Sequence, residues 1–439
     1  MSPSPSTPFL DAASAIGARL CRDAVWQGGR CNWIGASMEA VDGRWQVVQR
    51  SFGPELYAGT GGIAYFLLCL YRFTGDRILA RTAEGALRHA LSVADDLPAT
   101  SRWGFYTGLS GVAYVCAEAS EALGDERWLD AGLKLLEGLG DPPEDHLLDV
   151  LGGTAGAIPA LLSLAGRSGE EELGAKALRL GRGLTAAAVK RPQGWSWDTL
   201  ADDSKLLTDH MVGFSHGTGG IAWALLELFQ ATGEEIFRQA AEEGFRYERS
   251  WYDPARENWP DLRRYEALGG EQQAGLIYPS QWCHGAPGIG LARLRAYQLL
   301  GDETYRREAE AALRTTWKAI AQPEGGAAPN YSLCHGLAGN AELFLLAARA
   351  LGEPLLESVA EDVGRRGISA YEDAGKPWPS GVQGGAATPG LMLGEAGTGH
   401  FLLRLADPGA TPPVVILPAH EGTAASGDAA GGVKRAPAA

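Results

Sequence analysis

The tripeptide Cys-His-Gly occurs twice in this chain, at residues 283–285 and at residues 334–336. A thiolate is a soft metal ligand and an imidazole is a borderline one. Two cysteines and one histidine would supply three protein ligands to a catalytic zinc ion and leave its fourth tetrahedral position open. Core packing gives no reason for a histidine beside each cysteine, so the repeated tripeptide predicts a zinc site.

The remaining cysteines have no histidine beside them. Four residues belong to this group and are expected to be small core residues: Cys21, Cys31, Cys69 and Cys116. Six cysteines among 439 residues are too few for a disulfide framework. Metal binding is therefore expected only at the two tripeptides.

Both tripeptides end on the first glycine of a G-x-x-G pattern that occurs seven times. The first glycines of the seven copies are Gly59, Gly108, Gly153, Gly217, Gly285, Gly336 and Gly394. In six copies a third glycine follows sixteen residues after the first, and an acidic residue comes directly after it. This spacing is typical of a helix that ends in a left-handed glycine cap, followed by a helix that begins with a negative charge. Each copy is therefore predicted to be a helical hairpin.

The two helices of each predicted hairpin differ in composition. The segment between the glycines is apolar and small, as in IAYFLLCLYRFT, and is predicted to be a buried inner helix. The next segment alternates apolar and charged residues, as in EIFRQAAEEGFRYERSW, and is predicted to be an outer helix. The N-terminal FLDAASAIGARLCRDAVW supplies the outer helix that is missing before the first copy. We predict an all-α fold, an α/α toroid of seven inner and seven outer helices; the alternative is an open solenoid.

The predicted toroid domain spans residues 9–406. Residues 1–8 are expected to be a flexible N-terminus, and residues 407–439, rich in Ala, Gly and Pro, to be disordered. The longer connections all precede a G-x-x-G pattern, at residues 28–56, 192–213, 253–281, 322–333 and 373–390. They therefore share one rim with the first turns of the inner helices, where we expect the chemistry.

Histidine stands directly before the first glycine in three consecutive copies, as His216, His284 and His335. Two of these copies have a cysteine one residue earlier, Cys283 and Cys334. Equivalent positions of a closed ring point toward a common axis. These side chains are therefore expected to converge, although more than a hundred residues separate the first from the last.

The charge and the hydropathy of the chain limit its partners and location. A net charge of −15 disfavours nucleic acid and an anionic membrane surface, and suits a cationic peptide. No apolar run reaches the roughly 18 to 20 residues of a membrane span, and the start MSPSPSTPFLD lacks the features of a secretory signal. A cytoplasmic location is expected.

The segments SQWCHGAPGIGLARL and NYSLCHGLAGNAELFL resemble the zinc motifs of the LanC-like superfamily, whose repeat is G-x-x-G. The segments NWIGAS and GPELYAGTGGIAYF, and the histidine after the first zinc cysteine, are most similar to the C-terminal cyclase domain of class II (LanM-type) lanthipeptide synthetases. The resemblance covers residues 9–405. It implies a zinc-dependent lanthipeptide cyclase.

The resemblance also implies roles for individual residues. It marks Cys283, Cys334 and His335 as zinc ligands, and His216 and Asp149 as acid-base residues. His284 does not match a zinc ligand of the family, and we expect it and Trp282 to be substrate-pocket residues. By their own pattern, Asp149 could equally be a helix-capping carboxylate, His216 a rim histidine and Trp282 a packing residue. Which of His216 and Asp149 handles which proton is left open.

The implied reaction is the intramolecular Michael-type addition of Cys thiols to dehydroalanine or dehydrobutyrine, which forms (methyl)lanthionine thioether rings. The substrate is a dehydrated precursor peptide. Only about eight residues precede the first predicted helix, and no copy has the phosphate-binding pattern G-x-x-x-x-G-K-[ST]. A separate dehydratase is therefore expected as a partner, and the protein alone is expected to leave an unmodified precursor unchanged.

Three other functions fit parts of this pattern. A eukaryotic LanC-like homologue would add glutathione to dehydroamino acids in proteins. A zinc-bearing peptide-binding scaffold would need a fourth protein ligand, for which His284 is the obvious local candidate. Protein prenyltransferase subunits combine an α/α barrel with zinc, but they lack the two Cys-His-Gly tripeptides in register.

Overall fold

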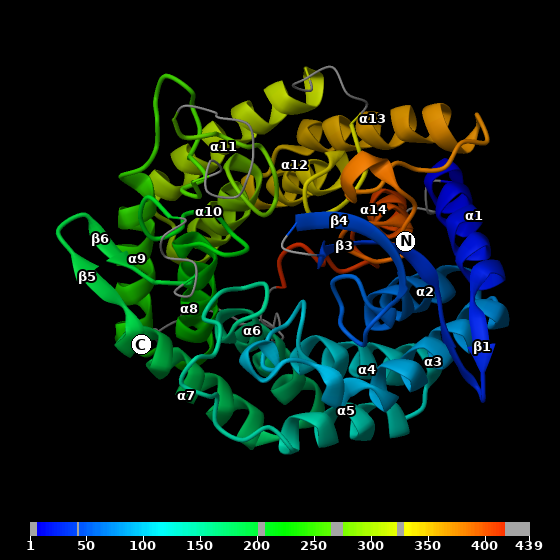
Figure 1. The fold of residues 1–439 in the computed structure, drawn as a ribbon. Helices are drawn as coiled ribbons and strands as arrows, with labels where there is room; N and C mark the ends of the chain where they lie inside the picture. Colours follow the sequence, from blue (N-terminus) through cyan, green and yellow to red (C-terminus); the bar gives the residue numbers. More distant parts are fainter. Residues whose placement is uncertain (1–6, 42–43, 201–206, 265–274, 323–328, 418–439) are drawn as a thin grey trace, which may run out of the picture.

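The computed structural model describes residues 7–41, 44–200, 207–264, 275–322 and 329–417. Its α-helices form two concentric layers around a common axis (Figure 1). The inner layer consists of α2 (Thr60–Thr74), α4 (Leu109–Leu123), α6 (Thr154–Ser168), α8 (Thr218–Thr232), α10 (Ala286–Leu300), α12 (Leu337–Leu351) and α14 (Glu395–Ala406). The outer layer consists of α1 (Thr7–Asp23), α3 (Arg77–Ser92), α5 (Arg127–Glu137), α7 (Glu171–Ala187), α9 (Glu235–Arg249), α11 (Glu303–Ala321) and α13 (Glu357–Gly367).

The inner helices begin and end at the glycines of the repeat. Six of them end at a glycine in the left-handed region, with φ between 66° and 76°, a conformation that costs glycine far less than other residues. The outer helix α3 then begins at Arg77 and is capped by Asp76, whose side chain accepts a hydrogen bond from the Ile78 N–H. The predicted hairpins are confirmed.

The second glycine of each G-x-x-G pattern permits a close backbone approach. In all seven copies an added Cβ would lie 1.8–2.1 Å from the carbonyl oxygen of the residue six positions earlier. The loop before each inner helix must therefore fold back over the first helical turn. This contact holds the residues directly before the helix at the inner edge of the rim.

Backbone hydrogen bonds join the residues that stand two positions before the first glycine of each copy. We call these seven residues the backbone ring. The bonds run from Tyr57 N to Tyr106 O (2.8 Å), Tyr106 N to Leu151 O (3.2 Å), Leu151 N to Ser215 O (3.1 Å), Ser215 N to Cys283 O (3.3 Å), Cys283 N to Cys334 O (3.3 Å), Cys334 N to Met392 O (2.9 Å) and Met392 N to Tyr57 O (2.8 Å). Because the last bond returns to the first residue, the repeat is closed and the open solenoid is excluded.

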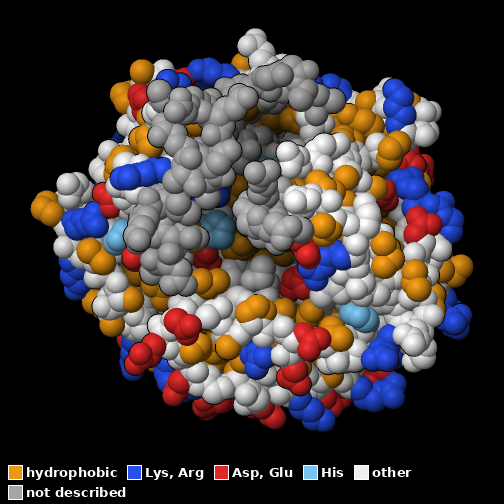
Figure 2. All heavy atoms as spheres, viewed as in Figure 1, with side chains coloured by type: hydrophobic (Ala, Val, Ile, Leu, Met, Phe, Trp, Pro, Cys, Tyr) orange, Lys and Arg blue, Asp and Glu red, His pale blue; other side chains and the backbone are white. Residues whose placement is uncertain are grey.

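The two ends of the helical chain complete this closure. Helix α1 packs along α14 and serves as its outer partner, as expected from the N-terminal segment, and α14 packs against α2 on its other side. The outer helices keep one face toward water, and charged side chains of both signs lie around the edge of the face shown in Figure 2. No helix in the described part of the chain is long and apolar enough to cross a membrane.

Three two-stranded antiparallel hairpins interrupt the helical pattern at the rim. They pair β1 (Val25–Gln27) with β2 (Arg30–Asn32), β3 (Ile34–Val41) with β4 (Arg44–Ser51), and β5 (Val189–Arg191) with β6 (Gly194–Ser196). In Figure 1 the β5–β6 hairpin extends from the outer edge, whereas β3 and β4 lie over the middle of the ring. Short 3₁₀ segments lie at Ala94–Asp96, Ala99–Ser101, Pro354–Leu356 and Gln383–Gly385, and a π-helical turn at Ile368–Glu372.

The prediction of disorder from residue 407 was wrong for the first part of the tail. The chain continues to Leu417 as a packed segment, and the four side chains of residues 414–417 are buried. The physical reason is the run Val-Val-Ile-Leu, an apolar stretch that the Ala, Gly and Pro content of the whole tail obscured. At the other end, α1 begins at Thr7, two residues before the predicted start. Residues 1–6 and 418–439 lie outside the described residues.

We expect His400 to make stability depend on pH. Its ring is buried in α14 and stacks on Tyr65 at 5.4 Å, and burial lowers its pKa from 6.5 to about 3. As the pH falls below 6.5, the unfolded chain takes up a proton that the folded chain does not, so the free energy of unfolding decreases until about pH 3. Urea unfolding of His400→Phe between pH 4.5 and 6.5 should show a slope shallower by about 1.4 kcal/mol per pH unit. An unchanged slope would mean that His400 is protonated in the folded state.

Candidate metal centre and its surroundings

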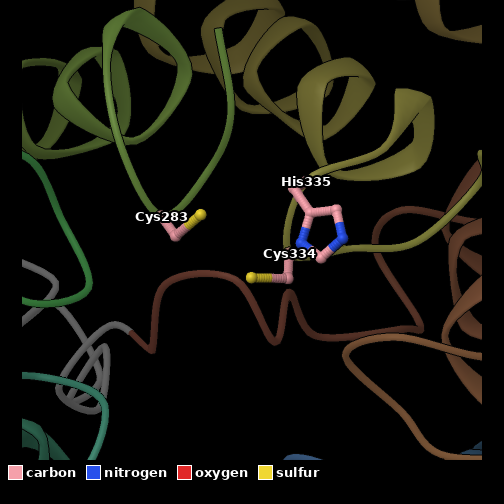
Figure 3. A group of neighbouring side chains, drawn as sticks. All are labelled: Cys283, Cys334 and His335. Atoms are coloured by element: carbon pink, nitrogen blue, oxygen red, sulfur yellow. The ribbon is translucent and has the colours of Figure 1, made fainter. Parts of the chain in front are cut away.

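Three potential metal ligands converge at the rim. One ligand atom each from Cys283, Cys334 and His335 lies within 4.8 Å of the other two. Figure 3 shows the two sulfur atoms and the imidazole facing a common space, with Cys283 on the loop before α10 and the other two on the loop before α12. Ligands about 2.0–2.3 Å from one zinc ion lie roughly 3.5–3.8 Å apart, so small side-chain movements would suffice. The donor set and its spacing fit zinc.

The backbone ring explains why residues 51 positions apart in sequence meet here. Cys283 and Cys334 are consecutive members of that ring, and the Cys283 N–H donates to the Cys334 carbonyl oxygen at 3.3 Å. The Cys334 N–H donates in turn to Met392 at 2.9 Å. The repeat therefore sets the distance between the two sulfur atoms before any metal binds.

The two thiols share their protons unequally. The pKa of Cys334 is held well below its usual value because the Cys283 thiol donates a hydrogen bond to its sulfur. His335 and Tyr57 act in the same direction, and together these contacts outweigh the opposing effect of burial. The pKa of Cys283 is raised well above its usual value by the same hydrogen bond and by burial. The pair thus offers one thiolate to a cation, and metal binding would displace the second proton.

The orientation of His335 follows from a backbone contact. Its Nε2 lies 2.7 Å from the carbonyl oxygen of Gly381, and a carbonyl can only accept, so Nε2 donates its hydrogen. The lone pair is therefore on Nδ1, which leaves that nitrogen as the metal ligand. The pKa of His335 is lowered by burial but raised overall by hydrogen bonding to Cys334. Gly381 lies in the predicted 373–390 connection, where no sequence pattern marked it.

Substitution of Gly381 tests the contact between its carbonyl oxygen and the His335 ring. An added Cβ would lie 2.7 Å from His335 Nε2 and 2.8 Å from the Ser332 hydroxyl, so the imidazole must move. We expect Gly381→Ala to weaken zinc binding about 10- to 100-fold, as measured by competition with a chelator. Gly174→Ala is the matched control, because nothing lies within 4 Å of its added Cβ. Equal zinc affinities of the two variants would contradict the assigned orientation.

Asp149 and His216 form a hydrogen-bonded pair. His216 Nδ1 and Asp149 Oδ2 are 2.6 Å apart, and the other oxygen of the buried carboxylate accepts from the Gly152 N–H at 2.8 Å. Nδ1 therefore donates to the carboxylate, and Nε2 is the nitrogen able to exchange a proton. The Gly152 N–H belongs to the loop before α6, which begins at Thr154, so this bond closes a turn of the loop and does not cap the helix. Of the two interpretations of this residue, helix capping and chemistry together with His216, its contacts fit the second.

The pair lies next to the potential metal ligands in the repeat. Asp149 lies two residues before Leu151, and His216 directly follows Ser215. Leu151, Ser215 and Cys283 are consecutive members of the backbone ring, followed by Cys334. All the residues that the sequence marked for chemistry thus belong to four neighbouring copies of the repeat.

His284 is a buried neutral residue beside this group. Its ring stacks on His216 with centroids 5.9 Å apart, and burial lowers its pKa to about 3. Its Nδ1 lies 3.9 Å from Asp261, whose carboxylate is held by Arg263 at 2.5 Å. His284 is not among the clustered ligands, so it does not supply the fourth ligand of a structural zinc site within the described residues. Asp261 and Arg263 lie in the 253–281 connection, where no local pattern marked them.

Trp282 is fully buried and packs its ring against Tyr106 and Phe214. Its indole N–H donates to the carbonyl oxygen of Val415 in the C-terminal segment at 2.7 Å. The position and contacts of the Trp282 ring therefore fit the alternative that it is a packing residue. A role in shaping the pocket remains a proposal.

The other cysteines fit the expected packing role. Cys31, Cys69 and Cys116 are buried, and burial raises the pKa of each thiol to about 12. Burial also raises the pKa of Cys21. None of these cysteines belongs to the cluster of potential metal ligands found among the described residues.

The fold and the site define a closed α/α toroid with a Cys₂His group at its rim. The chain belongs to the LanC-like family, because the family described as lanthionine synthetase C-like protein matches residues 51–416. This match confirms the resemblance found in the sequence.

Individual relatives agree with this membership. Glutathione S-transferase LANCL1 of Danio rerio is 23% identical over 376 residues, which cover 80% of this chain and 82% of that protein. The lacticin 481/lactococcin biosynthesis protein LcnDR2 of Lactococcus lactis subsp. lactis is 29% identical over 140 residues, 30% of this chain and only 14% of that protein. The solved structure of nisin cyclase has a TM-score of 0.59 at 18% identity, covering 80% of this chain and 88% of that chain. This last similarity supports the toroid fold.

Proposed function

We propose that this protein is a zinc-dependent lanthipeptide cyclase. The proposed reaction is the addition of a Cys thiol of a dehydrated precursor peptide to dehydroalanine or dehydrobutyrine within the same peptide. The observation that supports it best is the position of the Cys283, Cys334 and His335 group beside the Asp149–His216 pair. Membership of the LanC-like family supports the same reaction.

The proposed metal site accounts for activation of the nucleophile. A free thiol has a pKa of about 8.5, so only a few per cent is thiolate near neutrality. Zinc held by Cys283, Cys334 and His335 would lower the pKa of a substrate thiol and orient its sulfur. The backbone ring fixes both cysteines, and Gly381 fixes the histidine, so the residues of the site are preorganised.

The proposed role of His216 is proton transfer at Nε2. Addition of sulfur to the β-carbon moves the alkene electron pair toward the carbonyl group and creates an enolate, which must gain a proton at its α-carbon. The thiol loses one proton and the α-carbon gains one, so the reaction needs neither oxidant nor reductant. Asp149 accepts a hydrogen bond from Nδ1–H and fixes the tautomer and orientation of the His216 ring, which makes Asp149 a positioning residue for either direction of transfer. His284, neutral and stacked on His216, would add no competing charge.

The proposal includes one catalytic domain that spans residues 7–417, a cytoplasmic location and a separate dehydratase. The net charge of −15 suits a cationic precursor. The alternative function is transfer of glutathione to dehydroamino acids in proteins, which the similarity to a protein named glutathione S-transferase LANCL1 favours.

A competition assay separates these two reactions. A synthetic peptide with one dehydroalanine and one cysteine is incubated with zinc-loaded protein and excess glutathione, and analysed by mass spectrometry with thiol labelling. Cyclisation leaves the mass unchanged and removes the thiol, whereas glutathione transfer raises the mass by one glutathione. We expect cyclisation to dominate; predominant glutathione addition would support the alternative. Unmodified precursor with ATP and magnesium is the control, and loss of water from it would contradict the need for a dehydratase.

A further inference from the structure

The C-terminal segment Thr411–Leu417 turns back along α14 toward the ring axis. Asp407 ends α14 and accepts hydrogen bonds from the N–H groups of residues 409 and 410. Arg404 donates to the carbonyl oxygens of Pro408 (2.8 Å) and Thr411 (2.7 Å), which fixes the reversal. Figure 1 shows this red end of the chain near the middle of the toroid.

The segment contacts the inner helices along their later turns. A cavity of about 140 Å³ is lined by Pro413 and Ile416 together with Leu294 of α10, Leu346 of α12 and Arg404 of α14. The side chains of residues 414–417 are at most 6% exposed. The segment therefore lies between the inner helices, on the side of the backbone ring opposite to the rim loops.

Two buried donors at the rim bind the segment by its backbone. The Tyr106 hydroxyl donates to Val414 O at 2.7 Å, and the Trp282 indole N–H donates to Val415 O at 2.7 Å. Tyr106 belongs to the backbone ring, and Trp282 directly precedes the ring member Cys283. Figure 3 shows the C-terminal segment passing the two cysteines of the potential metal site.

We infer that Thr411–Leu417 is the floor of the metal centre and a positioning element for it. The segment fixes the indole of Trp282, and this contact holds the loop that presents Cys283. Without the segment, the indole N–H and the Tyr106 hydroxyl would lose these acceptors, and the side chains of residues 414–417 would no longer fill the space between the inner helices. The groove between the inner helices is thus a binding site for an extended apolar peptide, here supplied by the chain itself.

This inference concerns metal geometry and peptide binding, and its test does not require the proposed reaction. Two truncated proteins are compared, one ending at Ala410 and the other at Leu417. The ligand field of bound Co²⁺, recorded by visible absorption, reports the geometry of the Cys₂His site. We expect the protein that ends at Ala410 to show a shifted spectrum and about 10-fold or weaker zinc binding, and the one that ends at Leu417 to match the full chain.

A peptide added in trans makes the test specific. The synthetic peptide of residues 411–417, Thr-Pro-Pro-Val-Val-Ile-Leu, should bind the protein that ends at Ala410 and restore its Co²⁺ spectrum. The same peptide with Val415→Asp should do neither, because the groove is apolar. In calorimetry, Trp282→Phe in the truncated protein should weaken peptide binding about 2- to 10-fold. An unshifted Co²⁺ spectrum after truncation at Ala410 would overturn the positioning role.

Point variants of the full chain keep the inference testable if that truncation fails to fold. Trp282→Phe keeps a ring but loses the N–H that binds Val415, whereas Tyr106→Phe loses only the bond to Val414. We expect Trp282→Phe to shift the Co²⁺ spectrum more than Tyr106→Phe, because Trp282 adjoins Cys283. Unchanged zinc affinity and an unchanged spectrum in Trp282→Phe would show that the segment stabilises the fold without positioning the metal centre.

Discussion

Replacement of Cys283 or Cys334 by alanine is expected to remove most of the bound zinc and to abolish ring closure. Zinc sites with four protein ligands bind with about 10–16 kcal/mol, so one ligand is worth about 3 kcal/mol, or roughly 10²- to 10³-fold in affinity. The loss should be at the upper end because the ligands are already held by the backbone ring, and no other described side chain belongs to the cluster. The measurement is metal analysis of dialysed protein, expected at one zinc per chain before substitution.

The chain offers matched controls for this experiment. Cys69→Ala and Cys116→Ala remove buried thiols that lie in α2 and α4, away from the clustered ligands. Both should keep one zinc per chain and lose only stability, by about 1–3 kcal/mol for a small cavity. Full zinc retention in Cys283→Ala and Cys334→Ala, or zinc loss in the control variants, would contradict the assigned ligands.

The second large effect is expected at the Asp149–His216 pair. His216→Ala should keep zinc and fold but slow ring closure by about 10²- to 10⁴-fold, the usual contribution of a positioned acid-base group. Asp149→Asn should slow the same step, because the amide can present its N–H to His216 Nδ1 and stabilise the wrong tautomer. Thiol consumption on a dehydrated peptide under single-turnover conditions is the measurement.

The double variant distinguishes positioning from independent catalysis. If Asp149 acts through His216, then Asp149→Asn combined with His216→Ala should be no slower than His216→Ala alone. Multiplicative losses would show that Asp149 transfers a proton itself. Rates near those of the unsubstituted protein in both single variants would show that Asp149 and His216 have only a structural role.

The helical architecture could be predicted because its determinants are local and repeated. The left-handed caps at residues such as Gly75 and Gly124 require only the sequence around them, and seven copies made the pattern unmistakable. The convergence of Cys283 with Cys334 followed from the repeat register, and the structure explains it by hydrogen bonds between equivalent positions. The backbone ring itself was not predicted, because the residues two positions before the first glycine of each copy share no side-chain type.

The site contacts that were not predicted from the sequence depend on how loops of different length meet. Gly381 binds His335 from a connection without any sequence pattern, and Asp261 approaches His284 from another. Gly28 and Gly29, both with positive φ, form the turn of the β1–β2 hairpin. This Gly-Gly pair could have predicted a hairpin from the sequence, but only helical periodicity was used there. The packing of residues 414–417 was not predicted, because the composition was averaged over the whole tail of residues 407–439.

Metal removal and return on a single preparation tests whether ring closure by this protein depends on zinc. The protein is stripped of metal with a chelator, its helical content is checked by circular dichroism, and ring closure of a dehydrated Cys-containing peptide is followed by thiol labelling and tandem mass spectrometry. Zinc dependence predicts that the folded, metal-free protein closes rings no faster than buffer, and that one equivalent of zinc restores the rate. Ring closure at the original rate by the folded, metal-free protein would contradict it.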